Sequence, residues 1–201
     1  IGIPWRLAFA LQSDGWYLRQ DIIWHKPNPM PESVRDRCTK AHEYIFLLSK
    51  SQRYYFDHEA IKEPITTDPK ERYPKRARIT GRGAQGSANA RGADRDRSGG
   101  FPIPGNKRNR RSVWQVATQP YRSAHFAVFP PKLIEPCILA GCPKGGVVLD
   151  PFFGAGTTGL VANRLGRRCI GIDLNPEYVE MARARIAANR AAACADKRHG
   201  G

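Results

Sequence analysis

The chain has 201 residues and a net charge of +15, with 33 lysines and arginines against 18 acidic residues. A balance this basic makes a polyanion such as nucleic acid the expected partner. No apolar run approaches the roughly 18 residues of a membrane span, and no signal-like start is present, so we expect neither membrane insertion nor secretion. Five cysteines without a CxxC pair predict no disulfide or metal framework and indicate a reducing cytoplasm.

The first 57 residues are predicted to form one part of an α/β core. Apolar periodicity indicates a helix over residues 5–11 and strands over 17–24, 44–48 and 53–56, the last two joined by a turn. His25, His42 and His125 are scattered along the chain, so we interpret each as a hydrogen-bonding residue and expect no metal site.

Residues 58–118 form a basic, irregular insertion. Between residues 66 and 111 there are 13 basic and four acidic residues, and Gly, Ser, Pro and Asn replace aliphatic periodicity. Such a segment cannot build a core, and a solvated, disordered insertion is one interpretation. The other is a DNA-contacting region. Its candidate DNA-binding residues are Arg76, Arg78, Arg82, Lys107, Arg108, Arg110 and Arg111.

Residues 119–201 are predicted to hold a cofactor. The pattern predicts a buried helix over 133–140, a strand over 147–150, a glycine-rich turn, a helix over 157–165 ended by Gly166, and a strand over 168–173. A long surface helix over 178–195 follows. Asn175 is the expected cap of that helix, with Pro176 at its first position.

The glycine-rich turn admits two cofactor classes. Gly154, Gly156 and Gly159 fit GxGxxG, and Asp173 follows Gly154 by 19 residues, as in dinucleotide-binding proteins. However, Asp150 closes the strand just before the turn, where its carboxylate would repel a pyrophosphate. A cationic ligand such as S-adenosyl-L-methionine, with its ammonium and sulfonium groups, suits this position better. Asp173 can accept hydrogen bonds from ribose hydroxyls in either case.

Several segments together resemble DNA amino-methyltransferases, which methylate cytosine N4 or adenine N6. The turn, Asp150-Pro151-Phe152 with Gly154-Ala155-Gly156-Thr157-Thr158, resembles the cofactor loop of that family. The segments 171–175 and 125–134 resemble its ribose-binding and methionine-binding segments, and 2–6, 21–28 and 40–46 resemble parts of its catalytic half. The order, with the cofactor loop last, is that of a permuted branch.

The resemblance implies a doubly wound, Rossmann-like α/β methyltransferase sheet in which the basic insertion recognises the target sequence. It implies double-stranded DNA as partner, a bacterial or phage origin, and in some members a cognate restriction endonuclease or homodimerisation. A start similar to relatives with a Ser-Pro-Pro-Tyr motif slightly favours cytosine N4. The implied cofactor contacts are Phe126, Phe129, Pro130, Asp150, Pro151, Phe152, Gly154, Gly156, Thr157, Thr158 and Asp173.

The family's catalytic tetrapeptide, a polar residue followed by Pro-Pro and an aromatic, is missing from these residues. Residues 129–132 and 175–178 match it only in part, so no catalytic residue is assigned. We expect a fragment whose sheet is incomplete on its N-terminal side and exposes apolar strand edges. A DNA-binding module without catalysis and an NAD-dependent oxidoreductase are the alternative functions.

Overall fold

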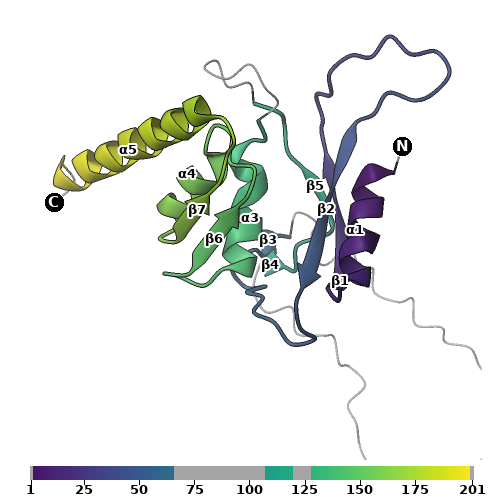
Figure 1. The fold of residues 1–201 in the computed structure, drawn as a ribbon, viewed down its shortest axis with the longest axis horizontal. Coiled ribbons are helices and arrows are strands. Elements are labelled where there is room, and N and C mark those ends of the chain that lie inside the picture. Colours follow the sequence, from purple (N-terminus) through teal and green to yellow (C-terminus); the bar gives the residue numbers. More distant parts are fainter. Residues whose placement is uncertain (1, 66–106, 120–127, 200–201) are drawn as a thin grey trace, which may run out of the picture. The chain divides into compact units, whose positions relative to one another are not determined.

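The computed structural model describes residues 2–65, 107–119 and 128–199 (Figure 1). Contacts divide the chain into two units, residues 1–61 with 110–201 and residues 62–109. The elements are α1 (Ile3–Ser13), β1 (Tyr17–His25), β2 (His42–Ser49), β3 (Glu63–Pro64), β4 (Lys107–Arg108), β5 (Val113–Gln115), α3 (Pro131–Gly141), β6 (Val147–Asp150), α4 (Thr157–Arg164), β7 (Arg168–Gly171) and α5 (Pro176–His199).

The larger unit contains a three-stranded sheet in the order β2-β1-β5, in which β2 is antiparallel and β5 parallel to β1. Trp24 of β1 is only 5% exposed. Its indole N–H donates a hydrogen bond to the carbonyl oxygen of Val116 at 2.8 Å, which satisfies the polar end of a buried ring. Trp24, Trp114 and Leu133 form the core between this sheet and α3.

The opposite face of the same sheet packs on α1. Side chains alternate along a strand, so Tyr44 and Phe46 face away from the Trp24 side. Trp5 of α1 lies edge-on to both rings, with centroid distances of 5.7 Å to Tyr44 and 4.9 Å to Phe46. The predicted helix and the first two predicted strands are thus confirmed.

The second sheet of this unit consists of the parallel strands β6 and β7. Val148 and Cys169 pair across the two strands and pack against α3 and α4, where Ile138 and Val161 are buried. Because α3 contributes Leu133 to one core and Ile138 to the other, it joins the two sheets (Figure 1).

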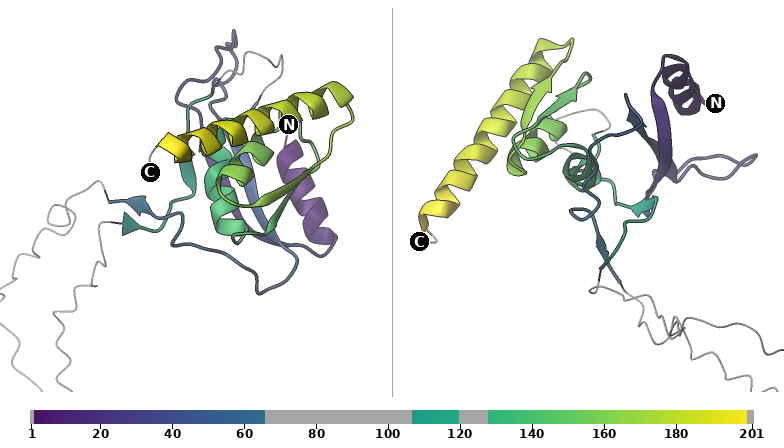
Figure 2. Two further views of the ribbon diagram at one scale, coloured as in Figure 1. Left: turned by 90° about the vertical axis from the view of Figure 1, so that its left-hand side faces the viewer. Right: turned by 90° about the horizontal axis from the view of Figure 1, so that it is seen from below.

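Helix α5 packs across α4 and extends well beyond it (Figure 2). The N–H of Glu177 donates to Oδ1 of Asn175 at 2.9 Å, which confirms the predicted cap, and Pro176 begins the helix as expected. Within the described residues, no helix is both long and apolar enough to cross a membrane.

Two predictions from the sequence differ from the structure: one predicted strand is absent, and another ends earlier than predicted. Residues 53–56, predicted as a strand, have no regular structure. Just before them the chain turns, and the hydroxyl of Ser49 donates to the carbonyl of Ser51. Just after them, the N–H of Asp57 donates to the carbonyl of Ala140 on α3. The strand predicted over 168–173 ends at Gly171. The backbone pairing continues for one more residue, since the N–H of Ile172 donates to the carbonyl of Asp150 at 2.9 Å. Beyond it, the carboxylate of Asp173 accepts the backbone N–H groups of Gly154 and Asn175.

The prediction of an incomplete sheet is confirmed. The described strands form separate sheets of three, two and two strands. On β6 and β7, the face opposite α4 carries the paired residues Leu149 and Ile170, which are 61% and 55% exposed. Parallel strands normally have both faces covered, and no described residue supplies on this face the packing that a doubly wound sheet provides.

Candidate cofactor site and nucleic-acid interface

The glycine-rich loop leaves β6 at Asp150 and enters α4 at Thr157. Gly154 and Gly156 have φ angles of 48° and 72°, in the left-handed region that other residues avoid. The N–H of Gly156 closes a tight turn onto the carbonyl of Phe153 at 2.9 Å. The N–H of Phe152 donates to Oδ1 of Asp150 at 3.0 Å. The predicted strand, glycine turn and helix are therefore all confirmed.

Asp173 holds the loop against the end of β7. One carboxylate oxygen accepts the N–H of Gly154 at 2.7 Å, and the other accepts the N–H of Asn175 at 2.9 Å. Each carboxylate oxygen has a second lone pair, so the side chain keeps capacity for further donors such as hydroxyl groups. Asp173 thus shapes the loop as well as offering acceptors beside it, a role that sequence reasoning did not anticipate.

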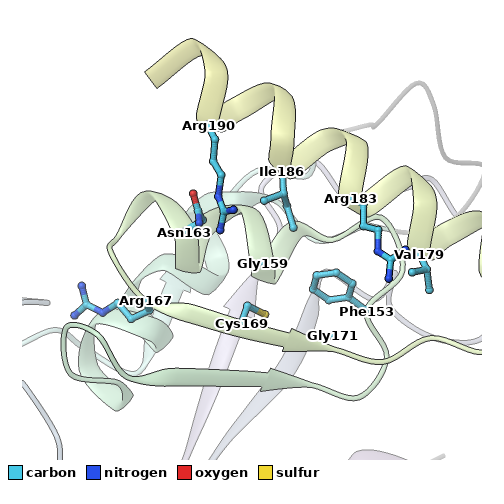
Figure 3. A pocket seen from close by; sticks show the side chains of 10 residues that line it. All are labelled: Phe153, Gly159, Asn163, Arg167, Cys169, Gly171, Val179, Arg183, Ile186 and Arg190. Carbon is cyan, nitrogen blue, oxygen red and sulfur yellow. The ribbon is translucent and has the colours of Figure 1, made fainter. Parts of the chain in front are cut away.

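Phe153 is wedged behind the loop, between α4, α5 and β7 (Figure 3). A Cβ added to Gly159 would lie 2.6 Å from Cζ of this ring, and one added to Gly171 would lie 2.3 Å from its Cγ. Because of this ring, a residue with a Cβ at either position would clash, so both positions require glycine. Next to the ring is a cavity of about 250 Å³, which Val179 and Ile186 of α5 also line.

Helix α5 supports the loop from the other side. A Cβ added to Gly156 would lie 2.7 Å from Cβ of Ala182, so this helix packs directly against the loop backbone. One guanidinium nitrogen of Arg185 donates to the carbonyl of Ala155 at 2.9 Å and lies 3.0 Å from the hydroxyl of Thr157. Sequence reasoning missed these contacts, although Ala182, Arg185 and Ile186 share the i, i+3, i+4 spacing of one helix face.

The structure brings most of the predicted cofactor residues into this loop. Phe152 is 89% exposed, whereas the side chains of Thr157 and Thr158 are buried at 3% and 5% exposure. The first turn of α4 has backbone N–H groups without intrahelical partners, as every helix has, so it can contact a carboxylate. The loop therefore offers an exposed ring, a carboxylate and N–H donors next to one another.

The negative charge of Asp150 affects the pKa of a neighbouring thiol. Burial raises the pKa of the Cys169 thiol, and the nearby carboxylate of Asp150 raises the pKa further. An anionic phosphate would meet the same repulsion, whereas an ammonium group would be attracted. The electrostatics at the end of β6 thus favour a cationic ligand over a dinucleotide.

Two of the predicted contacts lie at the other sheet, and one lies outside the described residues. Phe129 packs against the core of Trp24, Trp114 and Leu133, and Pro130 is fully buried just before α3. Phe126 is outside the described part of the chain.

The predicted DNA-binding residues fall into three groups. Arg76, Arg78 and Arg82 lie outside the described residues. In the smaller unit, Nε of Arg108 forms an ion pair with Glu63 at 2.9 Å, across the β3-β4 ladder.

The other described candidates differ in exposure. The guanidinium of Arg110 lies 4.6 Å from the ring centroid of Trp114, a cation–π contact. Among the described residues, Nη1 of Arg108 and Nε of Arg110 are buried without a hydrogen-bond partner. Lys107 and Arg111 are exposed.

A family model described as DNA methylase matches residues 2–184 of the chain. Among curated proteins, the Type II methyltransferase M.SmaI of Serratia marcescens is 52% identical over 190 residues, which cover 94% of this chain and 53% of that protein. M.Cfr9I of Citrobacter freundii, also a Type II methyltransferase, is 50% identical over 92% of this chain and 50% of its own length. The chain thus spans about half the length of these relatives.

Solved structures show the same fold. The PvuII DNA methyltransferase, described as cytosine-N4-specific, aligns with a TM-score of 0.59 and 22% identity over 89% of this chain and 55% of that chain. The complex of M1.HpyAVI with SAM aligns with a TM-score of 0.55 and 22% identity, covering 92% of this chain and 69% of the other. The Rossmann-like methyltransferase fold expected from the sequence is therefore confirmed.

Proposed function

This chain belongs to the DNA methylase family, and we propose that it binds S-adenosyl-L-methionine and takes part in methylating an exocyclic amino group in double-stranded DNA. The observation that carries the proposal is the loop after β6, where a carboxylate, an exposed ring and two left-handed glycines stand together.

The residues of the loop fit this cofactor. Asp150 accepts one N–H, from Phe152, which leaves lone pairs for the α-ammonium group. Asp173 likewise keeps lone pairs for the ribose hydroxyls after binding Gly154 and Asn175. The exposed ring of Phe152 offers an apolar surface, and the start of α4 offers N–H donors to the carboxylate. When bound, the cofactor supplies an electrophilic methyl group on its sulfonium.

Transfer also needs the amine to be positioned in line with that methyl group, because the lone pair of an exocyclic amine is delocalised into the base. We assign this role to no residue of the chain. The two segments that partly match the catalytic tetrapeptide have structural roles instead. Asn175 caps α5, and Pro131 begins α3 directly after the buried Pro130.

The substrate is proposed to be cytosine N4 rather than adenine N6, on the resemblance of the chain's start to Ser-Pro-Pro-Tyr relatives. Residues 58–118 are proposed to contact the DNA, since more than half of the net charge lies between residues 66 and 111. A cognate restriction endonuclease is a further proposal, suggested by relatives that are Type II methyltransferases. Homodimerisation stays a proposal that rests on the family alone.

Isothermal titration calorimetry of the chain with S-adenosyl-L-methionine and, separately, with NAD tests the cofactor. We expect heat only with the former. Asp150→Asn should weaken its binding about tenfold or more, because a charge-assisted hydrogen bond becomes a neutral one, whereas the exposed Asp36→Asn serves as a control without effect. Heat with NAD alone would support the oxidoreductase instead. DNA binding without heat from either cofactor would support a non-catalytic binding module.

A further inference from the structure

The cavity of about 250 Å³ beside Phe153 lies between α4, α5 and β7 (Figure 3). None of the residues proposed to contact the cofactor is part of its lining, so the proposed cofactor site does not explain it. Among the described residues that line it there is no aspartate or glutamate, but there are three arginines and an asparagine: Arg167, Arg183, Arg190 and Asn163. The cavity is therefore a place where positive charge is concentrated.

Arg190 can contact a ligand at this cavity. It is exposed on α5, and Figure 3 shows its side chain reaching from that helix toward Asn163 of α4. Within the part of the chain that the structure describes, its guanidinium forms no hydrogen bond and no ion pair. All of its N–H groups can thus donate to an anion beside α4.

Arg183 lies on the same face of α5. It precedes Arg190 by seven residues, which is two turns of the helix, and its side chain points to the same side (Figure 3). Its guanidinium forms an ion pair with Glu180 at 2.8 Å, but the two side chains are 73% and 70% exposed. An exposed ion pair contributes little to stability, so Arg183 can exchange Glu180 for a better anion.

Arg167 adds a buried positive charge at the start of β7. It is 7% exposed, and its guanidinium donates to the carbonyl oxygens of Cys142 and Leu165. Carbonyl oxygens carry only partial charges, so the positive charge is not neutralised, and it acts strongly in surroundings of low dielectric constant. The carboxylate of Asp150 affects the thiol of Cys169 in the lining, but Asp150 is not itself a lining residue and faces three guanidinium groups.

Apart from the thiol of Cys169, the remaining side chains of the lining are apolar: Phe153, Val179 and Ile186. Pockets for drug-sized ligands measure about 300–1,000 Å³, so this cavity suits a smaller molecule. An anion joined to a small carbon skeleton matches the lining, because the skeleton can pack on the apolar side chains while the anion meets the arginines. Guanidinium groups bind phosphate oxygens through bidentate hydrogen bonds, which favours a phosphate as the anion.

We propose that this cavity binds a sugar phosphate, with Arg183 and Arg190 donating to the phosphate oxygens and the sugar lying on Val179 and Ile186. The site does not involve the cofactor loop, so the inference goes beyond the proposed function. Two sources carry this chemistry, the backbone of DNA and a free sugar phosphate. A backbone phosphate held here positions the duplex without reading its sequence.

Deoxyribose 5-phosphate is the probe for NMR of the unmodified chain. It should shift the methyl resonances of Val179 and Ile186 but not those of Val161, which is buried elsewhere on α4, and deoxyribose without phosphate should shift none. Arg190→Gln should weaken binding of the probe about tenfold, because charge-assisted hydrogen bonds are lost. Arg168→Gln removes the same charge on the opposite face of β7 and should have no effect.

Duplex DNA distinguishes the two sources of the phosphate. If a backbone phosphate occupies the cavity, Arg190→Gln should reduce the slope of log K against log[salt] for DNA binding by about one, and Arg168→Gln should not. An unchanged slope, with deoxyribose 5-phosphate still bound, identifies a free sugar phosphate. Absent methyl shifts in the unmodified chain, or equal weakening by the two variants, overturns the site. Neither readout uses S-adenosyl-L-methionine, so failure of the site leaves the proposed function standing.

Discussion

Gly156→Ala tests the packing of α5 on the cofactor loop. Gly156 has a φ of 72°, a conformation that costs a residue with a Cβ about 1–2 kcal/mol. The new Cβ would also lie 2.7 Å from Cβ and 3.1 Å from Cα of Ala182, which is completely buried. A clash with backbone cannot be relieved by a rotamer change, so overpacking adds about 1–3 kcal/mol. We therefore expect a total loss of about 2–5 kcal/mol.

Gly166→Ala is the matched control, because Gly166 has the same φ of 72° and nothing within 4 Å of the added Cβ. The backbone cost and the effect of alanine on the unfolded chain are common to both variants, so their difference isolates the clash. In urea unfolding followed by circular dichroism, the midpoint of Gly156→Ala should lie roughly 0.5–1.5 M below that of Gly166→Ala. Coinciding midpoints would show that α5 does not press on the loop as described.

Two further predictions concern the same region, and a third concerns Cys137 of α3. Phe153→Ala should lower the free energy of unfolding by about 1–3 kcal/mol, because the ring packs on two glycines. Phe152 is the control, since its ring is 89% exposed. Phe152→Ala should leave the urea midpoint unchanged and should weaken only cofactor binding, measured by calorimetry. Arg185→Met should weaken cofactor binding by removing the contacts to the loop. Arg183→Met, whose side chain is 73% exposed, should not, and equal effects of the two variants would contradict the role of Arg185 in holding the loop. Burial raises the pKa of Cys137 from 9.0 to about 11, so at pH 8 its alkylation, followed by mass spectrometry, should be roughly a hundredfold slower in the folded chain than in urea. The raised pKa stabilises the fold fully below pH 9, and this contribution is lost as the pH rises toward 11.

Much of the segment from β6 to α5 could be predicted because its signals are local. An apolar run before Asp150, glycines at turn positions and a cap at Asn175 each leave a mark within a few residues, and the structure has the strand, the turn and the helix starts where those marks lie. The contacts of Phe153 and Arg185 could not be predicted in this way. Both depend on how α5 lies on α4, which is a tertiary contact between segments about 30 residues apart.

The predicted strand at residues 53–56 failed for a related reason. Tyr54, Tyr55 and Phe56 have the residue types of a strand, but a strand needs a neighbour to pair with. Among the described residues this segment has none, and its following residue binds the end of α3 instead. Residue types alone therefore predicted a strand that the tertiary structure does not form.

The hydrogen bonds of Asp173 and Arg185 to the cofactor loop have a kinetic consequence. Both partners of each bond belong to the chain itself, so the loop does not depend on a ligand for its shape. Ordering a flexible backbone would consume about 1–2 kcal/mol for each residue on every binding event. Here the loop is already ordered when the chain folds. The association rate of the cofactor should therefore be set by diffusion and correct orientation, without a loop-ordering step. Exchange of the spent cofactor for a fresh one should likewise require no opening of the loop.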